Sequence, residues 1–141
     1  MRVERVVLDT NVILSAALLP LSVPARVTQW VLMHSLLLFS PATFAEIETR
    51  IWRPKFDRYL SIEARRSILR DLDAVAEWVT PAEGEFPAYS RDADDDKFVH
   101  LALAGRAQWL VSGDSDLLTV ASPPGLTILT PAQALAHIER E

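Results

Sequence analysis

Two apolar runs of this chain end in an aspartate, and such acids can form a cation site. The first run ends at Asp9 and the second, after a Ser-Gly turn, at Asp114. If both runs are parallel strands of one sheet, their C-terminal ends share an edge and the carboxylates converge there. A further group of acids precedes Asp114: Asp92, Asp94, Asp95 and Asp96. Converging carboxylates repel one another unless they share protons or bind a cation, so the pattern predicts a divalent-metal site.

Each acid also has a structural explanation when it is taken alone. Asp9 and the acids of residues 92–96 could cap helices, and Gly-Asp-Ser-Asp at 113–116 is typical of a turn. A cap accounts for some of the acids at 92–96 and not for all of them. Because three separate acid groups fall at predicted strand and helix ends, coincidence is the weaker account. Hard cations such as Mg²⁺ and Mn²⁺ prefer oxygen ligands, and such sites suit phosphoryl chemistry.

Short apolar strands alternate with amphipathic helices, which indicates an α/β protein with a mostly parallel sheet and helices on both faces. Strands are predicted at residues 3–8, 36–39, 109–112 and 126–129, with another near 78–79. Helices are predicted at residues 12–17, 25–35 and 116–118. Further helices are predicted to run from Pro41 to a stop at Pro54, from Ser61 onward, from Phe98 to a C-cap at Gly105, and from Pro131 onward. Residues 81–90 are predicted to be a loop. The four tryptophans fall on apolar faces, and we expect them in the core: Trp30, Trp52, Trp78 and Trp109.

Length and composition favour one domain, residues 1–141, in the cytoplasm. The chain has no cysteine, which excludes a disulfide framework and a thiolate zinc site. Its apolar stretches are broken well short of the roughly 20 residues that span a bilayer, and we expect neither a signal segment nor a membrane contact. Half of the residues are hydrophobic, which leaves room for a self-association face.

The overall charge does not favour nucleic-acid binding by bulk electrostatics, because 14 Lys and Arg stand against 19 Asp and Glu, a net charge of −5. Basic residues nevertheless gather between residues 50 and 70. This basic segment could be a solvated helical face or a grip on a phosphate backbone. Its basic residues are Arg50, Arg53, Lys55, Arg58, Arg65, Arg66 and Arg70.

Four segments, in this order, resemble the PIN domain family of metal-dependent ribonucleases over nearly the whole chain. They are Val-Leu-Asp-Thr-Asn-Val at 7–12, Phe-Ala-Glu at 44–46, Asp-Asp-Asp-Lys-Phe at 94–98 and Leu-Val-Ser-Gly-Asp-Ser-Asp-Leu at 110–117. The nearest likeness is to the bacterial and archaeal toxins of toxin–antitoxin pairs, in which a segment like Arg-Pro-Lys-Phe at 53–56 recurs. The resemblance implies a three-layer PIN-like α/β domain, with a mostly parallel sheet of about five strands and an acidic pocket at its C-terminal edge.

The resemblance also implies which residues act. The four family acids correspond to Asp9, Glu46, Asp96 and Asp114, which are expected to hold Mg²⁺ or Mn²⁺ and to carry catalysis. The pocket-supporting or substrate-binding positions correspond to Asn11, Ser112 and Asp116, and with RNA as substrate Arg50 and Arg53 of the basic segment join them. Two of the acids have rivals. Glu48 competes with Glu46, although the two point about 200° apart on a helix, and Asp94 and Asp95 compete with Asp96.

The leading hypothesis is a metal-dependent endoribonuclease that hydrolyses RNA phosphodiester bonds, the toxin of a type II toxin–antitoxin pair. Its expected partners are RNA, a small antitoxin protein and a second copy of the chain in a homodimer. A Mg-dependent phosphotransfer or phosphatase domain is one alternative, although Asn11 stands where such phosphatases need a second acid. A non-catalytic metal-binding interaction module is the other.

Overall fold

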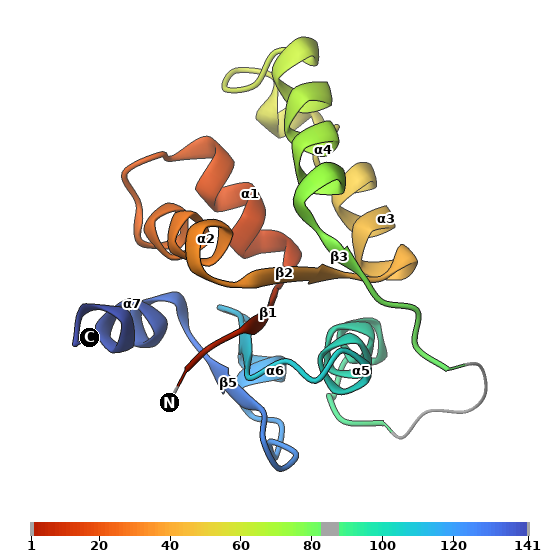
Figure 1. Cartoon of the computed structure of the whole chain (residues 1–141). Helices are drawn as coiled ribbons and strands as arrows, with labels where there is room; N and C mark the ends of the chain where they lie inside the picture. Colours follow the sequence, from red (N-terminus) through yellow and green to blue (C-terminus); the bar gives the residue numbers. More distant parts are fainter. Residues whose placement is uncertain (1, 83–87, 141) are drawn as a thin grey trace.

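Five parallel strands form one sheet in a computed structural model that describes residues 2–82 and 88–140 (Figure 1). The strand order is β3-β2-β1-β4-β5. The strands are β1 (Arg5–Leu8), β2 (Leu36–Phe39), β3 (Glu77–Trp78), β4 (Trp109–Val111) and β5 (Thr127–Leu129). The expected parallel sheet is confirmed, while residues 83–87 of the predicted loop lie outside the described residues.

The helices begin where short polar side chains precede a helical run. Ser40 and Thr130 each accept a hydrogen bond from an amide of the helix that follows, and a proline occupies the first turn of both helices. The helices are α1 (Thr10–Leu18), α2 (Val23–His34), α3 (Pro41–Arg50), α4 (Ile62–Val75), α5 (Asp96–Ala104), α6 (Ser115–Leu118) and α7 (Pro131–Glu139), with short 3₁₀ turns at η1 (Pro54–Phe56) and η2 (Ala93–Asp95).

Helices cover both faces of the sheet, which confirms the three-layer arrangement. Alternate residues of β1 point to opposite faces, as a strand requires. Val6 and Leu8 pack in a core with side chains of α1, α2, α3, α4 and α7. Val7 packs on the other face with side chains of α5 and α6. Strands buried on both faces explain why their sequences are continuously apolar rather than alternating.

The strand order reverses between β1 and β4. The chain proceeds from β1 to β2 on one side and from β4 to β5 on the other. Leu8 is in register with Val111, so both strands end at the same level and the residues after them meet at one edge. A crevice at such a reversal is the usual ligand site of an open α/β sheet.

Gly105 ends α5, as predicted, but this position does not need a glycine for a left-handed backbone conformation. Its φ is −88°, and the left-handed residue is Arg106, with φ of 56°. A Cβ on Gly105 would lie 2.5 Å from Cδ1 of Leu38, which is fully buried in the sheet. Close packing between the helix end and β2 therefore requires the glycine.

Two of the four tryptophans are exposed, contrary to expectation. Trp109 is buried and Trp30 packs against the core, whereas Trp52 and Trp78 are 39% and 42% exposed. The prediction was wrong for Trp52 because α3 ends at Arg50, so the ring leaves the helix stripe and lies over the Arg65 guanidinium. Trp78 lies on β3, an edge strand that has a neighbouring strand on one side only, and its ring packs against those of Phe39 and Phe44.

Among the described residues, no single helix is long and apolar enough to cross a membrane. The pair α1 and α2, bent by 105° at the break between them, passes that test only when the two are taken together.

Candidate active site

A polar pocket of about 180 Å³ opens at the sheet edge where β1 and β4 end. The ends of these strands, α3 and the η2 turn before α5 supply its walls. Its lining is predominantly acidic and consists of Asp9, Thr10, Asn11, Glu46, Arg50, Asp92, Asp94, Asp95, Phe98 and Asp114. The structure therefore brings together carboxylates from four separate parts of the chain.

Asp9 is the most deeply buried acid of the pocket, with 4% of its surface exposed. It caps α1, and its Oδ1 accepts a hydrogen bond from the Val12 amide at 2.9 Å. Its Oδ2 accepts a hydrogen bond from the Ser112 hydroxyl. Burial raises the pKa of the Asp9 carboxyl, the two hydrogen bonds oppose that rise, and the nearby charges of Asp114 and Glu46 add to it.

Ser112 connects the two strand ends. Its side chain is fully buried, donates to Asp9 Oδ2 and accepts a hydrogen bond from the Asp114 amide at 2.9 Å. Its own amide donates to the Leu129 carbonyl of β5 at 3.0 Å. One hydroxyl thus orients the first acid and positions the backbone that carries the last one.

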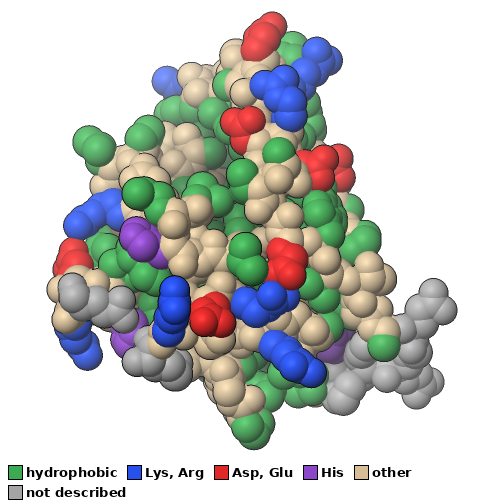
Figure 2. Space-filling view, in the orientation of Figure 1, with side chains coloured by type: hydrophobic (Ala, Val, Ile, Leu, Met, Phe, Trp, Pro, Cys, Tyr) green, Lys and Arg blue, Asp and Glu red, His purple; other side chains and the backbone are tan. Residues whose placement is uncertain are grey.

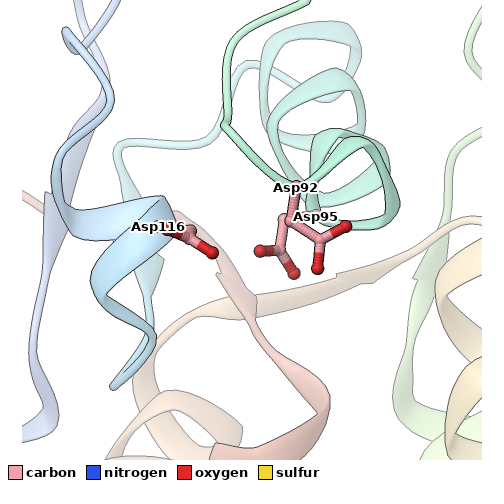
Figure 3. A group of neighbouring side chains, drawn as sticks. All are labelled: Asp92, Asp95 and Asp116. Carbon is pink, nitrogen blue, oxygen red and sulfur yellow. The ribbon is translucent and has the colours of Figure 1, made fainter.

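Asp114 and Asp116 follow β4 at the start of α6. Asp114 caps this helix, and its Oδ1 accepts a hydrogen bond from the Asp116 amide at 2.9 Å. Asp116 is absent from the described pocket lining. Its carboxylate faces those of Asp92 and Asp95, which line the pocket, and the three offer oxygens within 4.8 Å of one another (Figure 3).

Asp95 is the acid of the central run that faces Asp114. Burial raises the pKa of Asp95 to about 7, and the charges of Asp114, Asp92 and Asp116 add to that rise. Asp95 Oδ2 is buried and has no hydrogen-bond partner among the described residues. An unpartnered buried oxygen among like charges indicates a place for a cation.

The structure places Asp96 elsewhere than the family resemblance suggested. Its side chain is buried, and its Oδ1 accepts hydrogen bonds from the amides of Tyr89 and Ser90, at 3.2 and 2.7 Å. Oδ1 of Asp96 therefore holds the backbone before η2, and Asp96 is outside the described pocket lining. Asp96 is the first residue of α5, so its direction differs from that of Asp95 in the preceding turn.

Glu46 lines the pocket from α3. Its Oε1 accepts from Arg50 at 2.9 Å and from Lys97 Nζ at 3.0 Å, and its Oε2 accepts a hydrogen bond from the Thr10 hydroxyl. Glu48, its rival in the sequence, is exposed and outside the described lining. Lys97 and Thr10 were not expected to contact Glu46. Lys97 follows Asp96 and Thr10 follows Asp9 within the motifs of the sequence, and this adjacency could have indicated that both lie near the pocket.

The remaining predicted site residues divide between the pocket and the surface. Asn11 is an exposed part of the pocket wall, and the hydrogen bonds that the Asp9 carboxylate accepts from the described residues come from Ser112 and Val12. Arg50 lines the pocket, whereas Arg53 lies beyond the end of α3, exposed and outside the described lining.

The rest of the basic segment is not a uniform face. Arg65 is 4% exposed, bonded to Asp57 at 2.9 Å and stacked under Trp52, so it stabilises the link between α3 and α4. Four further side chains are exposed besides Arg53: Lys55, Arg58, Arg66 and Arg70. On the face drawn in Figure 2, basic and acidic side chains are interspersed.

The donor set fits a hard divalent cation. The aspartates around Asp95 offer only oxygen ligands, and the two acids with raised pKa values, Asp9 and Asp95, both owe part of the rise to neighbouring carboxylates. Mg²⁺ and Mn²⁺ prefer such ligands. A bound cation would remove the repulsion among these carboxylates.

Comparisons with known proteins agree on family and fold. The PIN domain family model matches residues 5–116, which include all the pocket residues. An uncharacterized protein of Methanocaldococcus jannaschii is 31% identical over 118 residues, which are 82% of this chain and 74% of that protein.

Two crystal structures have a similar fold. One is VapBC2 from Rickettsia felis bound to a DNA fragment from their promoter, with a TM-score of 0.60, 14% identity and coverage of 89% of this chain and 98% of that chain. The other is PAE2754 from Pyrobaculum aerophilum, with a TM-score of 0.60, 16% identity and coverage of 99% and 91%. At these identities the likeness concerns the fold.

Proposed function

The chain belongs to the PIN domain family, and from this premise we propose that it is a metal-dependent endoribonuclease whose active site is the acidic pocket. The observation that carries the proposal is the convergence of Asp9, Asp95 and Asp114 on one pocket at the strand-order reversal. Carboxylates in that arrangement suit hydrolysis of a phosphodiester, which needs no catalytic histidine or cysteine.

We propose that Asp9, Asp95 and Asp114 hold Mg²⁺ or Mn²⁺, with Asp92 and Asp116 beside them. When bound, such an ion makes an attacking water more acidic and neutralises charge on the phosphate. Asp95 replaces Asp96 in this proposal, because the Asp96 carboxylate is already bonded to two backbone amides. Ser112 and the Val12 amide keep Asp9 in one orientation.

The partners follow from the same family resemblance. We propose that the chain forms one nuclease domain, that it acts on cytoplasmic RNA as the toxin of a toxin–antitoxin pair, and that a small antitoxin protein and a second copy of the chain bind it. Several large apolar side chains are available for such contacts, because they are 46% to 93% exposed: Leu19, Leu21, Met33 and Leu36.

A matched pair of aspartate substitutions tests the proposal. Asp9→Asn removes a charge in the pocket, and Asp73→Asn removes one from an exposed position on α4. We expect Asp9→Asn to lower Mn²⁺-dependent cleavage of a labelled single-stranded RNA by more than about 100-fold, because even residues that only support metal ligands cost up to that much. Asp73→Asn should cleave like wild type, with both variants folded by circular dichroism.

Two results would overturn the proposal. One is equal cleavage by wild type and Asp9→Asn, and the other is cleavage that survives EDTA. Stabilisation by Mn²⁺ without cleavage of any RNA tested would instead favour a non-catalytic metal-binding module.

A further inference from the structure

A second pocket adjoins the acidic one and has a different lining. Its volume is about 310 Å³, which is within the range of small-molecule sites. It lies between the start of α3, the residues after β3 and one face of α5, and no acid stands among its described lining residues. We call it the apolar pocket, because most of its wall consists of Pro41, Ala42, Pro81 and Ala82.

Lys97 connects the apolar pocket with the acidic pocket. Its side chain lines the first, and its Nζ lies 3.0 Å from Oε1 of Glu46, which lines the second. On α3, Ala42 of the apolar pocket precedes Glu46 by four residues, a rise of about 6 Å. About two nucleotides of a strand, with a rise of about 3.4 Å each, span that distance. An RNA strand with a phosphate in the acidic pocket can therefore place a nearby base in the apolar pocket.

His100 and the start of α3 supply the groups that can recognise a base. The His100 ring lines the apolar pocket, is half-buried and packs edge-on against Tyr89, with ring centroids 5.9 Å apart. Histidine is among the aromatic side chains on which RNA bases stack. Ala42 lies in the first turn of α3, where a backbone N–H has no acceptor within the helix, and the Ser40 cap accepts from Thr43 instead. The Ala42 amide can thus donate to the edge of a base.

We propose that the apolar pocket binds one base of the RNA beside the acidic pocket, with His100 as the residue on which the base stacks. The inference rests on the proposed function, since RNA is the substrate named there. A nucleobase has uncharged faces and a polar edge, which the apolar wall and the α3 amide complement. A site for a phosphate alone would instead be lined mainly by cations and amides.

RNA with and without bases tests the apolar pocket. A fluorescein-labelled single-stranded hexanucleotide and the same ribose–phosphate chain without bases are titrated into Asp9→Asn, which does not cleave under the proposed function. Both ligands have the same phosphates, so the difference between their Kd values measures the contribution of the bases. We expect the base-free chain to bind at least about tenfold more weakly, the loss typical of one stacked base.

His100→Ala and Ala42→Leu, each in the Asp9→Asn background, should remove that difference in two ways. The first deletes the ring, and the second fills the pocket from an exposed helix position where leucine is well tolerated. Each should weaken binding of the hexanucleotide about five- to tenfold and leave the Kd of the base-free chain within about twofold of the background value. Circular dichroism verifies that both variants are folded.

Two matched controls lie outside the described lining of the apolar pocket. His34→Ala removes an exposed histidine of α2. Ala132→Leu changes the start of α7, where Ala132 follows the Thr130 cap and Pro131 just as Ala42 follows Ser40 and Pro41. Both controls should bind the two ligands like the background.

Two results would overturn the base site. One is an equal loss of affinity for both ligands in His100→Ala and Ala42→Leu, which would indicate a contact with the backbone of the RNA. The other is no loss for either ligand. These titrations do not depend on cleavage. If the expected contrast is found but the wild type does not cleave RNA with Mn²⁺, the proposed function fails and the base site stands, whereas metal-dependent cleavage without the contrast has the opposite meaning.

Discussion

The two sides of the pocket contain the same chemical group in opposite surroundings. On the aspartate side, which comprises Asp9, Asp92, Asp95, Asp114 and Asp116, burial raises the pKa of Asp95 to about 7, and the charges of neighbouring carboxylates add to that rise. On α3, the Glu46 carboxylate instead contacts two cations, Arg50 and Lys97. The comparison teaches that the neighbours of an acid, rather than its presence in a motif, decide whether its negative charge is already compensated.

The largest expected effect is on the aspartate side. Asp95→Asn should reduce Mn²⁺-dependent RNA cleavage by more than about 100-fold, because it removes the carboxylate with the unpartnered oxygen, which is central to the proposed metal site. Single-turnover cleavage of a labelled RNA measures it. Cleavage by Asp95→Asn at the wild-type rate would show that Asp95 is not needed for activity and would contradict the contrast drawn between the aspartates and Glu46.

Ser112→Ala should have the next largest effect, because it acts on Asp9 without removing any charge. Loss of the hydroxyl that orients Asp9 Oδ2 should lower the cleavage rate by about 10–100-fold. Ser112→Thr retains a hydroxyl and should preserve more activity than Ser112→Ala. The same loss in both variants would mean that packing at this buried position, rather than the hydrogen bond, supports the site.

Asp96→Ala should reduce stability more than chemistry. The substitution leaves the Tyr89 and Ser90 amides without their buried acceptor, so we expect a loss of about 1–3 kcal/mol in the free energy of unfolding. Asp94→Ala, at an exposed position, should change it by no more than about 0.5 kcal/mol. Urea denaturation of both variants gives the comparison, and equal stabilities would contradict a structural role for Asp96.

The smallest expected effect is a pH dependence of the metal-free protein. The pKa of Asp95 is about 3.8 in the unfolded chain and about 7 in the folded one, so between these pH values the folded state binds more protons. Stability in EDTA should therefore fall as pH rises from about 4 to about 7.

Thermal melting at about pH 5 and about pH 7.5 measures this dependence. Asp95→Asn should weaken it, and Mn²⁺ should oppose it by stabilising the ionised carboxylates. A dependence of undiminished size in Asp95→Asn would assign the effect to other groups, such as Asp9, whose pKa is also raised by burial.

Most of the fold could be predicted from local patterns. Continuous apolar runs indicated strands buried on both faces, and Ser, Thr and Pro indicated where helices begin. The prediction of burial was wrong where it depended on the residue at which a helix ends, as for Trp52, which lies beyond the end of α3 and is exposed. Gly105 was expected at a helix end, but its packing against Leu38 joins residues that are distant in sequence.

The sequence by itself determined that acids stand at strand ends, because the end of an apolar run is a local property. It could not decide between Asp95 and Asp96, since consecutive residues of a turn point in different directions and long-range contacts select the one that faces Asp114. Nor could it show that Lys97 of α5 would contact Glu46 of α3. Only the tertiary structure decided which carboxylates have cations beside them, because that depends on distances between segments that the chain order leaves open.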